Sequence, residues 1–262
     1  MEARRLIVPA LTLASFACAS LAGTQTITVQ FTSNQPNGGF STSPVWFAAH
    51  NGTFDFFTPG VAASPALEAM AELGVGAGLT SELGASGVAE TIATDVVHPQ
   101  FTPGETASMT LDVPNTSMNR WFSFASMIVP SNDFFIGNDN PLAHPIFDAA
   151  GNFIGPVTIQ IFGSNAWEGT TEVNDINLGI AFLVGRDAVG GTPEAGPVRS
   201  VFSVPANTAY IQSIVGQQTP VYTVTDALTP GDLLATIVVT PAPGGAALLG
   251  LAAVFATRRR RQ

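Results

Sequence analysis

Hydrophobic and polar residues alternate along several short segments of the chain, a pattern that predicts strands with one buried face. In residues 26–32, Ile27, Val29 and Phe31 fall on one face and polar side chains fall on the other. Similar apolar runs predict nine further strands, at residues 45–49, 53–57, 108–113, 121–129, 157–162, 179–184, 209–214, 221–225 and 233–239. The pattern therefore indicates a protein built mainly of strands.

One segment, at residues 65–73, predicts a helix instead. Ser64 is suited to cap its first turn, Pro65 is favoured at the first helical position, and Gly74 is suited to end it. No internal repeat or linker divides the central part of the chain. The sequence thus predicts one all-β domain over residues 23–240, an antiparallel β-sandwich with one or two short helices.

The composition supports short strands joined by tight turns. The 262 residues include 26 Gly and 19 Pro, spread along the whole length. Only 11% of the residues are charged, and all nine basic residues are arginines. This composition argues against a coiled coil, a disordered acidic tail and a nucleic-acid-binding protein.

The N-terminus has the layout of a secretory signal peptide, which we assign to residues 1–22. Two arginines follow Met1, residues 6–19 are apolar, and small residues stand at 20–22, where a signal peptidase would cut. Cys18 lies inside this segment. We therefore expect an exported protein whose mature chain has no cysteine, and hence no disulfide.

The C-terminus, residues 241–262, resembles a bacterial PEP-CTERM sorting tail. Pro241 and Pro243 end the last predicted strand, residues 244–257 are apolar and uncharged, and four arginines follow at 258–261. The resemblance implies that a membrane protease reads and removes this segment. A simple C-terminal membrane anchor is the alternative. Both interpretations predict a protein that is secreted or held at the cell surface, with membrane contact only through its terminal signals.

Without its ends the chain is strongly acidic. Residues 23–241 hold 18 acidic residues and three arginines, Arg120, Arg186 and Arg199, which gives a net charge of −15. Such an imbalance disfavours anionic polymers as partners and favours cations or calcium-bridged contacts. Acidity kept for solubility or for a salty habitat is the alternative explanation.

The usual signatures of enzymes are missing from the sequence. It contains no nucleophile elbow, no paired histidines and no phosphate-binding loop. His50, His98 and His144 are far apart along the chain, and the last two precede proline, so they do not predict a zinc site. We therefore expect a protein that is not an enzyme.

Oxygen-bearing side chains cluster in predicted loops between residues 121 and 187. They stand in four groups, at residues 131–133, 137–140, 167–172 and 174–175. Calcium binds six to eight oxygen atoms, and the loops at one end of a sandwich can bring such atoms together. Carboxylates that share a loop cluster would repel one another unless a cation neutralised them. These groups therefore indicate either a calcium site or a set of solvated turns.

Residues 122–137, with the sequence FSFASMIVPSNDFFIG, resemble the hallmark segment of the spondin N-terminal domain. In that family a strand with Ser-Met-Ile runs into Pro-Ser-x-Asp, an aromatic residue and an aliphatic-Gly pair. Residues 167–172, WEGTTE, are similar to the family's Asp-Ala-Gly-Thr-Asp loop, with Glu168 and Glu172 in place of two aspartates. Residues 27–47 also fit the opening strands of the family.

The resemblance implies a fold like that of C2 domains and a calcium site formed by three acidic loop residues. Carried over to this sequence, the calcium ligands are Asp133, Glu168 and Glu172, with Asp139 and Asp175 in reserve. A glutamate carries one more methylene than an aspartate, so the loop backbone must lie farther from the ion, and bidentate coordination could compensate.

We therefore expect a secreted or surface-displayed bacterial module that binds calcium and acts in adhesion or in the extracellular matrix of a biofilm. Its expected partner is an extracellular polysaccharide or a cell-surface protein. Two alternatives stay open. One is a hydrolase of surface glycans that uses Glu168 and Glu172 as a carboxylate pair. The other is a C2-like calcium-dependent lipid binder, for which the sequence lacks the usual basic patch.

Overall fold

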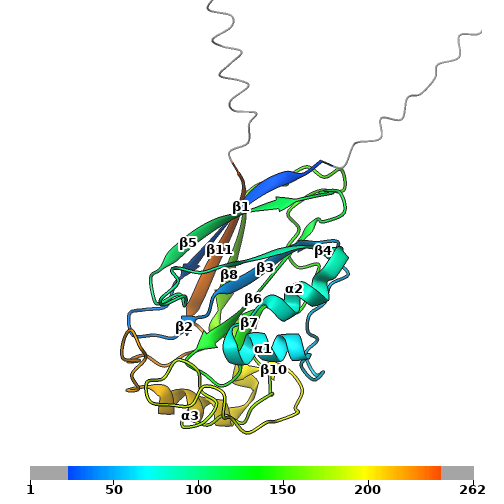
Figure 1. The fold of residues 1–262 in the computed structure, drawn as a ribbon. Helices are drawn as coiled ribbons and strands as arrows, with labels where there is room; N and C mark the ends of the chain where they lie inside the picture. Colours follow the sequence, from blue (N-terminus) through cyan, green and yellow to red (C-terminus); the bar gives the residue numbers. More distant parts are fainter. Residues whose placement is uncertain (1–22, 243–262) are drawn as a thin grey trace, which may run out of the picture.

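A computed structural model describes residues 23–242 and shows two antiparallel sheets packed against each other (Figure 1). Within these residues the first sheet has four strands, in the order β5 (Thr106–Val113), β1 (Gln25–Ser33), β11 (Leu233–Pro241) and β8 (Val157–Phe162). The second sheet has seven strands, in the order β10 (Arg199–Ser200), β9 (Ala166–Glu168), β7 (Phe134–Gly137), β6 (Trp121–Val129), β3 (Val45–His50) and β4 (Gly87–Ile92), with β2 (Ser41–Thr42) also paired to β6. The predicted β-sandwich is confirmed.

The main hydrophobic core fills the space between the two sheets. The alternation predicted for β1 is present, since Ile27, Val29 and Phe31 are buried in this core. Phe47 of β3 and Phe134 of β7 enter the same core from the second sheet. Burying this apolar surface is the main favourable contribution to the stability of the fold.

A second apolar cluster covers the outer face of the second sheet and makes the fold three layers deep. Strand β3 is buried on both faces because helices α1 (Pro65–Leu73) and α2 (Ala77–Leu83) lie on its outer side (Figure 1). Trp46 of β3 and Phe135 of β7 pack there against Leu67 and Met70 of α1.

Helix α1 has the bounds that the sequence predicts. The Ser64 hydroxyl accepts a hydrogen bond from the Leu67 N–H (3.2 Å), so it caps the first turn. Gly74 ends the helix with φ of +68°, a left-handed conformation that favours glycine. A side chain at this position would also collide with Ser43, whose Cβ lies 2.4 Å from the place of the missing Cβ.

The prediction of one or two helices is wrong, because the described residues contain three α-helices. The third, α3 (Pro205–Ile214), includes residues 209–214, which the apolar pattern predicts as a strand. Its buried residues Tyr210, Ile211 and Ile214 have the spacing of one helix face. Three short 3₁₀ helices complete the helical segments: η1 (Gly84–Ser86), η2 (Gly163–Asn165) and η3 (Val201–Ser203).

Three other predicted strands, at residues 53–57, 179–184 and 221–225, are not strands in the structure. Most of their apolar residues are buried all the same, although Val184 and Val221 are exposed. Phe56 and its neighbours belong to the outer cluster, and Ile180 and Val224 belong to the main core. An apolar run predicts burial more safely than it predicts a strand, because an irregular segment can also bury its side chains.

The loops that hold the predicted calcium ligands gather with α3 at one end of the sandwich. Figure 1 shows this end opposite the points where the described chain begins and ends. Residues 1–22 and 241–262, predicted as a signal peptide and a sorting tail, lie outside the described residues except for Pro241 and Ala242. Among residues 23–242, no helix has the length and apolarity needed to cross a membrane.

Candidate metal centre

Strand pairing brings the two predicted ligand segments together. Strands β7 and β9 are antiparallel neighbours, with Phe134 opposite Glu168. The N–H of Gly169 therefore donates a hydrogen bond to the carbonyl of Asp133 (3.0 Å). All three predicted ligands are buried, with exposed fractions of 0% for Asp133, 1% for Glu168 and 7% for Glu172. They lie in one region of the loop end, but their carboxylates have different surroundings.

The Asp133 carboxylate is held on one side only. Its Oδ2 accepts hydrogen bonds from the N–H of Thr171 (2.7 Å), the N–H of Glu172 (3.3 Å) and the Thr171 hydroxyl (3.3 Å). Its Oδ1 is buried and has no hydrogen-bond partner. Burial raises the pKa of Asp133 to about 7, although the two N–H donors favour the ionised form. A buried acceptor without a partner is costly, so this oxygen calls for an explanation.

The Glu172 carboxylate fits into a space that two glycines leave open. A Cβ added at Gly191 would lie 2.2 Å from Oε1, and one added at Gly179 would lie 2.3 Å from Oε2. Oε2 of Glu172 is buried and has no hydrogen-bond partner. Burial and the nearby negative charge of Glu72 raise the pKa of Glu172 to about 7.

Glu168 differs from the other two because both of its carboxylate oxygens have partners. Oε2 accepts from the Arg199 Nε (2.6 Å), an ion pair, and from the Asn207 amide (3.0 Å). Oε1 accepts from the Asn174 amide (2.7 Å). Arg199 comes from β10 and Asn207 from α3, so Glu168 ties these elements to the end of β9.

Three other side chains of this region lie outside the predicted ligand set, although the oxygen-bearing groups at residues 131–133 and 174–175 include two of them. Asn132 accepts a hydrogen bond from the N–H of Asp175 (3.1 Å) and donates to the carbonyl of Leu178 (2.8 Å). Asn174 has a buried Oδ1 without a partner. Both asparagines stand in the oxygen-rich segments of the sequence, which was the available signal. Glu72 of α1, whose pKa burial raises, had no such signal.

The two reserve residues are not equivalent. Asp175 follows Asn174 in the same loop, and its carboxylate accepts a hydrogen bond from the N–H of Asn177 (2.8 Å). Asp139 is exposed and lines a different cavity, beyond the end of β7. Only Asp175 therefore lies in the loops of the candidate site.

The donor atoms fit calcium in their chemistry. Three buried oxygens of this end, Asp133 Oδ1, Glu172 Oε2 and Asn174 Oδ1, lack hydrogen-bond partners, and calcium prefers carboxylate and amide oxygens. Between residues 23 and 242, however, no three His, Cys, Asp or Glu side chains are grouped so that they could hold a metal ion. Amide or main-chain oxygens would therefore have to complete the ligand set.

The comparison with protein families supports the first part of the resemblance. Residues 24–142 match the family of the spondin N-terminal domain, Spondin_N. The match covers less than half of the chain. It includes the segments 27–47 and 122–137 and therefore Asp133, and it ends before Glu168 and Glu172. No curated protein matches the chain.

Proposed function

We propose that this protein is a secreted or surface-displayed module of the spondin type that binds calcium and acts in adhesion or in an extracellular matrix. The match of residues 24–142 to the spondin N-terminal domain supports the extracellular setting. The single observation that carries the calcium assignment is Asp133, a fully buried carboxylate with one oxygen unpartnered.

A cation would resolve the electrostatic problem at this end of the sandwich. Asp133 and Glu172 are buried near Glu72, and the negative charges of these neighbours disfavour the ionised forms of both. Calcium would pair with the open oxygens of Asp133 and Glu172 and would connect the β6–β7 turn to the loop after β9. Its role would be structural, because it would make the loop end rigid for contact with a partner.

In this proposal Glu168 positions the loop and does not bind the ion. Its ion pair with Arg199 and its bonds to Asn174 and Asn207 would have to break before it could turn to a metal. The Asn174 amide that donates to Glu168 also carries one of the open oxygens. Glu168 thereby orients a neighbouring donor. The same contacts occupy both oxygens of the Glu168 carboxylate, which disfavours it as the general acid of a glycan hydrolase.

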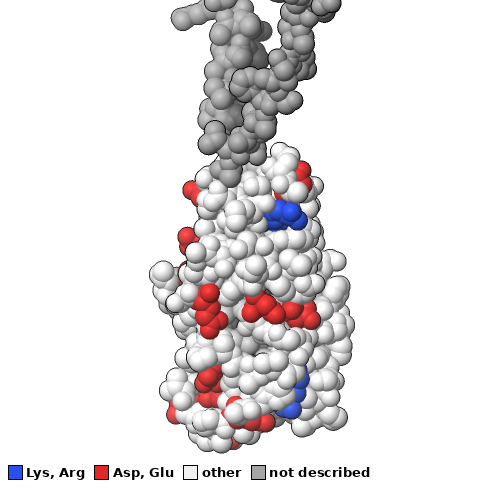
Figure 2. Space-filling view, turned by 90° about the vertical axis from the view of Figure 1, so that its right-hand side faces the viewer, with Lys and Arg blue, Asp and Glu red and all other residues white. Residues whose placement is uncertain are grey.

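The surface charge agrees with a partner that is cationic or bridged by calcium. Figure 2 shows acidic side chains at the upper edges, across the middle and at the lower end of one face, with few basic side chains among them. A membrane rich in anionic lipids would be repelled by such a face in the absence of a bridging ion. This distribution disfavours lipid binding that does not depend on calcium.

Thermal unfolding of the full chain in calcium, magnesium and chelator tests the proposal. Calcium at about 100 times its dissociation constant should stabilise the protein by about 2.7 kcal/mol, and magnesium should have less effect. Asp133→Asn, which keeps the size of the side chain, should abolish the calcium shift. The matched control is Asp226→Asn, since Asp226 is an exposed loop aspartate. An equal calcium shift in Asp133→Asn and in the wild-type protein would overturn the assignment.

A further inference from the structure

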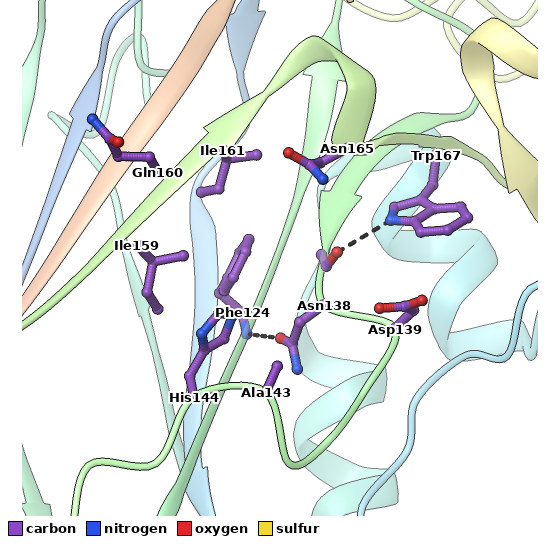
Figure 3. A pocket seen from close by; sticks show the side chains of 11 residues that line it. Phe124, Asn138, Asp139, Ala143, His144, Ile159, Gln160, Ile161, Asn165 and Trp167 are labelled. Carbon is purple, nitrogen blue, oxygen red and sulfur yellow. Dashed lines mark hydrogen bonds between the residues drawn. The ribbon is translucent and has the colours of Figure 1, made fainter.

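A cavity of about 210 Å³ lies where β8 of the first sheet faces the end of β7 in the second (Figure 3). Its inner wall is apolar and is formed by Phe124, Ile159 and Ile161, all of which are buried. Exposed residues, among them Asp139, stand at its mouth. The cavity is therefore open to a ligand from solution. It is smaller than the roughly 300 Å³ or more of pockets for drug-sized molecules, so it suits a single ring.

Trp167 gives this cavity an aromatic wall that is held in place. Its indole N–H donates to the carbonyl of Gly137 (3.2 Å), and Phe57 packs edge-on against its ring at 5.3 Å. The indole donor is thus already used, and the half-buried ring offers apolar surface to a ligand. Neighbouring residues of a strand point to opposite sides of the sheet. Trp167 therefore points away from the side of β9 on which Glu168 contacts the candidate metal centre.

Two polar side chains of the cavity, beside Trp167, are open to a ligand. Among the described residues, the Asp139 carboxylate has no hydrogen-bond partner, and neither has the Nδ2 of Asn165, whose Oδ1 accepts from the Phe162 N–H (3.1 Å). In Figure 3 the side chains of Asp139 and Asn165 lie beside the cavity, near Trp167. A carboxylate acceptor and an amide donor can bind neighbouring hydroxyl groups of one ligand.

The turn that carries Asp139 is fixed by a buried neighbour. Asn138 accepts a hydrogen bond from the Phe124 N–H (3.1 Å) and donates to the Ser123 hydroxyl (2.9 Å) and the Asn140 carbonyl (2.9 Å). The turn is therefore rigid before any ligand binds. Preorganisation of this kind lowers the entropic cost of binding.

The charge of the cavity excludes anionic ligands. No arginine lines it, and Asp139 is its one carboxylate among the described residues. His144 also lines it, and burial lowers the pKa of His144, so its imidazole is neutral near pH 7. A phosphate, a sulfate or a uronic acid would meet a negative charge with no cation to offset it.

We propose that this cavity binds one uncharged sugar unit of an extracellular polysaccharide. A sugar ring has a C–H face that packs on an aromatic wall, and it has neighbouring hydroxyls for Asp139 and Asn165. The choice of a polysaccharide rests on the proposed extracellular function, whereas the cavity shares no ligand residue with the proposed calcium site. The two proposals can therefore fail independently.

Affinity electrophoresis of the full chain through gels that contain dextran, mannan, galactan or soluble β-glucan tests this proposal, with alginate as the anionic comparison. At least one neutral polymer should retard the protein, and alginate should not. Asp139→Ala should weaken binding by about tenfold, the loss expected for one hydrogen bond to a charged group. Asp226→Ala removes an exposed aspartate elsewhere and should leave binding unchanged. Unfolding curves of both variants check that the fold is kept.

Three results would overturn the proposal: no retardation by any neutral polymer, equal retardation by alginate, or unchanged binding in Asp139→Ala. Each gel is run in calcium and in chelator. Retardation that persists in chelator while calcium fails to shift the melting temperature would leave the sugar site standing and remove the calcium site.

Discussion

Two buried polar regions lie near the two ends of strand β6, and they differ in whether every buried polar atom has a hydrogen-bond partner. Near its start, His50 Nε2 lies 2.8 Å from the Ser123 hydroxyl, and His50 Nδ1 accepts from the Gly52 N–H (3.1 Å). Beyond its end, Asp133 and Glu172 each leave a buried oxygen without a partner. The first region is complete within the chain. The second has the open acceptors that a bound cation would satisfy.

Burial disfavours the charged form in both regions, with opposite consequences. It lowers the pKa of His50 to about 4, so the imidazole is neutral and needs nothing further. It raises the pKa of Asp133 and of Glu172 to about 7, which leaves these carboxylates partly ionised near neutral pH. Residues buried to a similar degree can therefore be purely structural or can indicate a site, and the unpartnered atoms distinguish the two.

The largest expected effect comes from Arg199→Met. Glu168 lies close to Asp133 and Glu172, but like His50 it has partners for all of its polar atoms, and Arg199 is one of them. Removal of Arg199 leaves a carboxylate that is 1% exposed without its counter-charge. Loss of one partner of a buried ion pair costs about 3–5 kcal/mol of unfolding free energy, and because the Arg199 side chain is itself 35% exposed we expect the lower end, about 3 kcal/mol. Urea unfolding measures the loss.

Glu168→Gln combined with Arg199→Met is the matched control for that prediction. The double variant has no unpaired charge and should recover most of the stability, so the two changes should be strongly non-additive. Full stability in Arg199→Met alone would show that the ion pair is not needed, and Glu168 would then be free to act as a metal ligand.

The pH dependence of the unfolding free energy tests whether His50 is buried as a neutral imidazole in its hydrogen bond with Ser123. The folded pKa of about 4 lies below the unfolded value of 6.5, so the unfolded chain binds a proton first as the pH falls. The stabilisation is fully present above pH 6.5 and decreases as the pH falls toward 4, where about 3 kcal/mol is lost. Asp133 and Glu172 act in the opposite direction over this range, because their pKa values are raised to about 7 in the fold and their protonation stabilises it. The loss due to His50 is therefore read as the difference between the unfolding free energies of the wild-type protein and of a His50 variant from pH 7.5 to pH 4, measured in chelator.

His50→Gln isolates the contribution of the imidazole from those of the carboxylates. The variant keeps hydrogen-bonding atoms for Ser123 but cannot take up the proton. Between pH 6.5 and pH 4 its unfolding free energy should therefore increase by about 3 kcal/mol relative to that of the wild-type protein. Parallel curves for the two proteins would mean that His50 is protonated without penalty in the fold.

The same contrast shows what a sequence can predict. Ile27, Val29 and Phe31 alternate with polar residues, and Ser64 and Gly74 bound a helix, so β1 and α1 follow from local patterns. Residues 209–214 were predicted as a strand because a short apolar run fits a buried helix equally well.

The candidate site was only partly predictable for a related reason. Asp133 carries a local motif, but its contact with the loop after β9 depends on the pairing of β7 with β9, which no local pattern encodes. Glu72 enters the region from α1, and Arg199 reaches Glu168 from β10. A long-range partner of this kind has no signal in the sequence around the residue that it contacts.

Glu172→Gln tests whether the unpartnered oxygen of Glu172 is a calcium ligand. If Glu172 is a ligand, the neutral amide should weaken calcium binding at least about tenfold, which is about 1.4 kcal/mol. Glu168→Gln serves as the companion variant and should keep the calcium-dependent shift in melting temperature even if the fold is less stable. Calcium titration followed by the melting temperature separates the two. The reverse ranking of the two variants would make Glu168 the ligand and Glu172 a neighbour.

The smallest effect is expected from Glu72→Gln, which removes a charge next to the open oxygens without touching them. Glu72 is half-buried, and its charge disfavours ionised Asp133 and Glu172. In chelator the variant should therefore be more stable, by about 0.5 kcal/mol, the size typical of partly exposed charge interactions. In calcium the sign should reverse, because a nearby negative charge attracts the ion. Melting curves in both conditions measure the two signs. A variant less stable than wild type in both conditions would show that Glu72 acts through packing, and that repulsion among these carboxylates is not what a cation relieves.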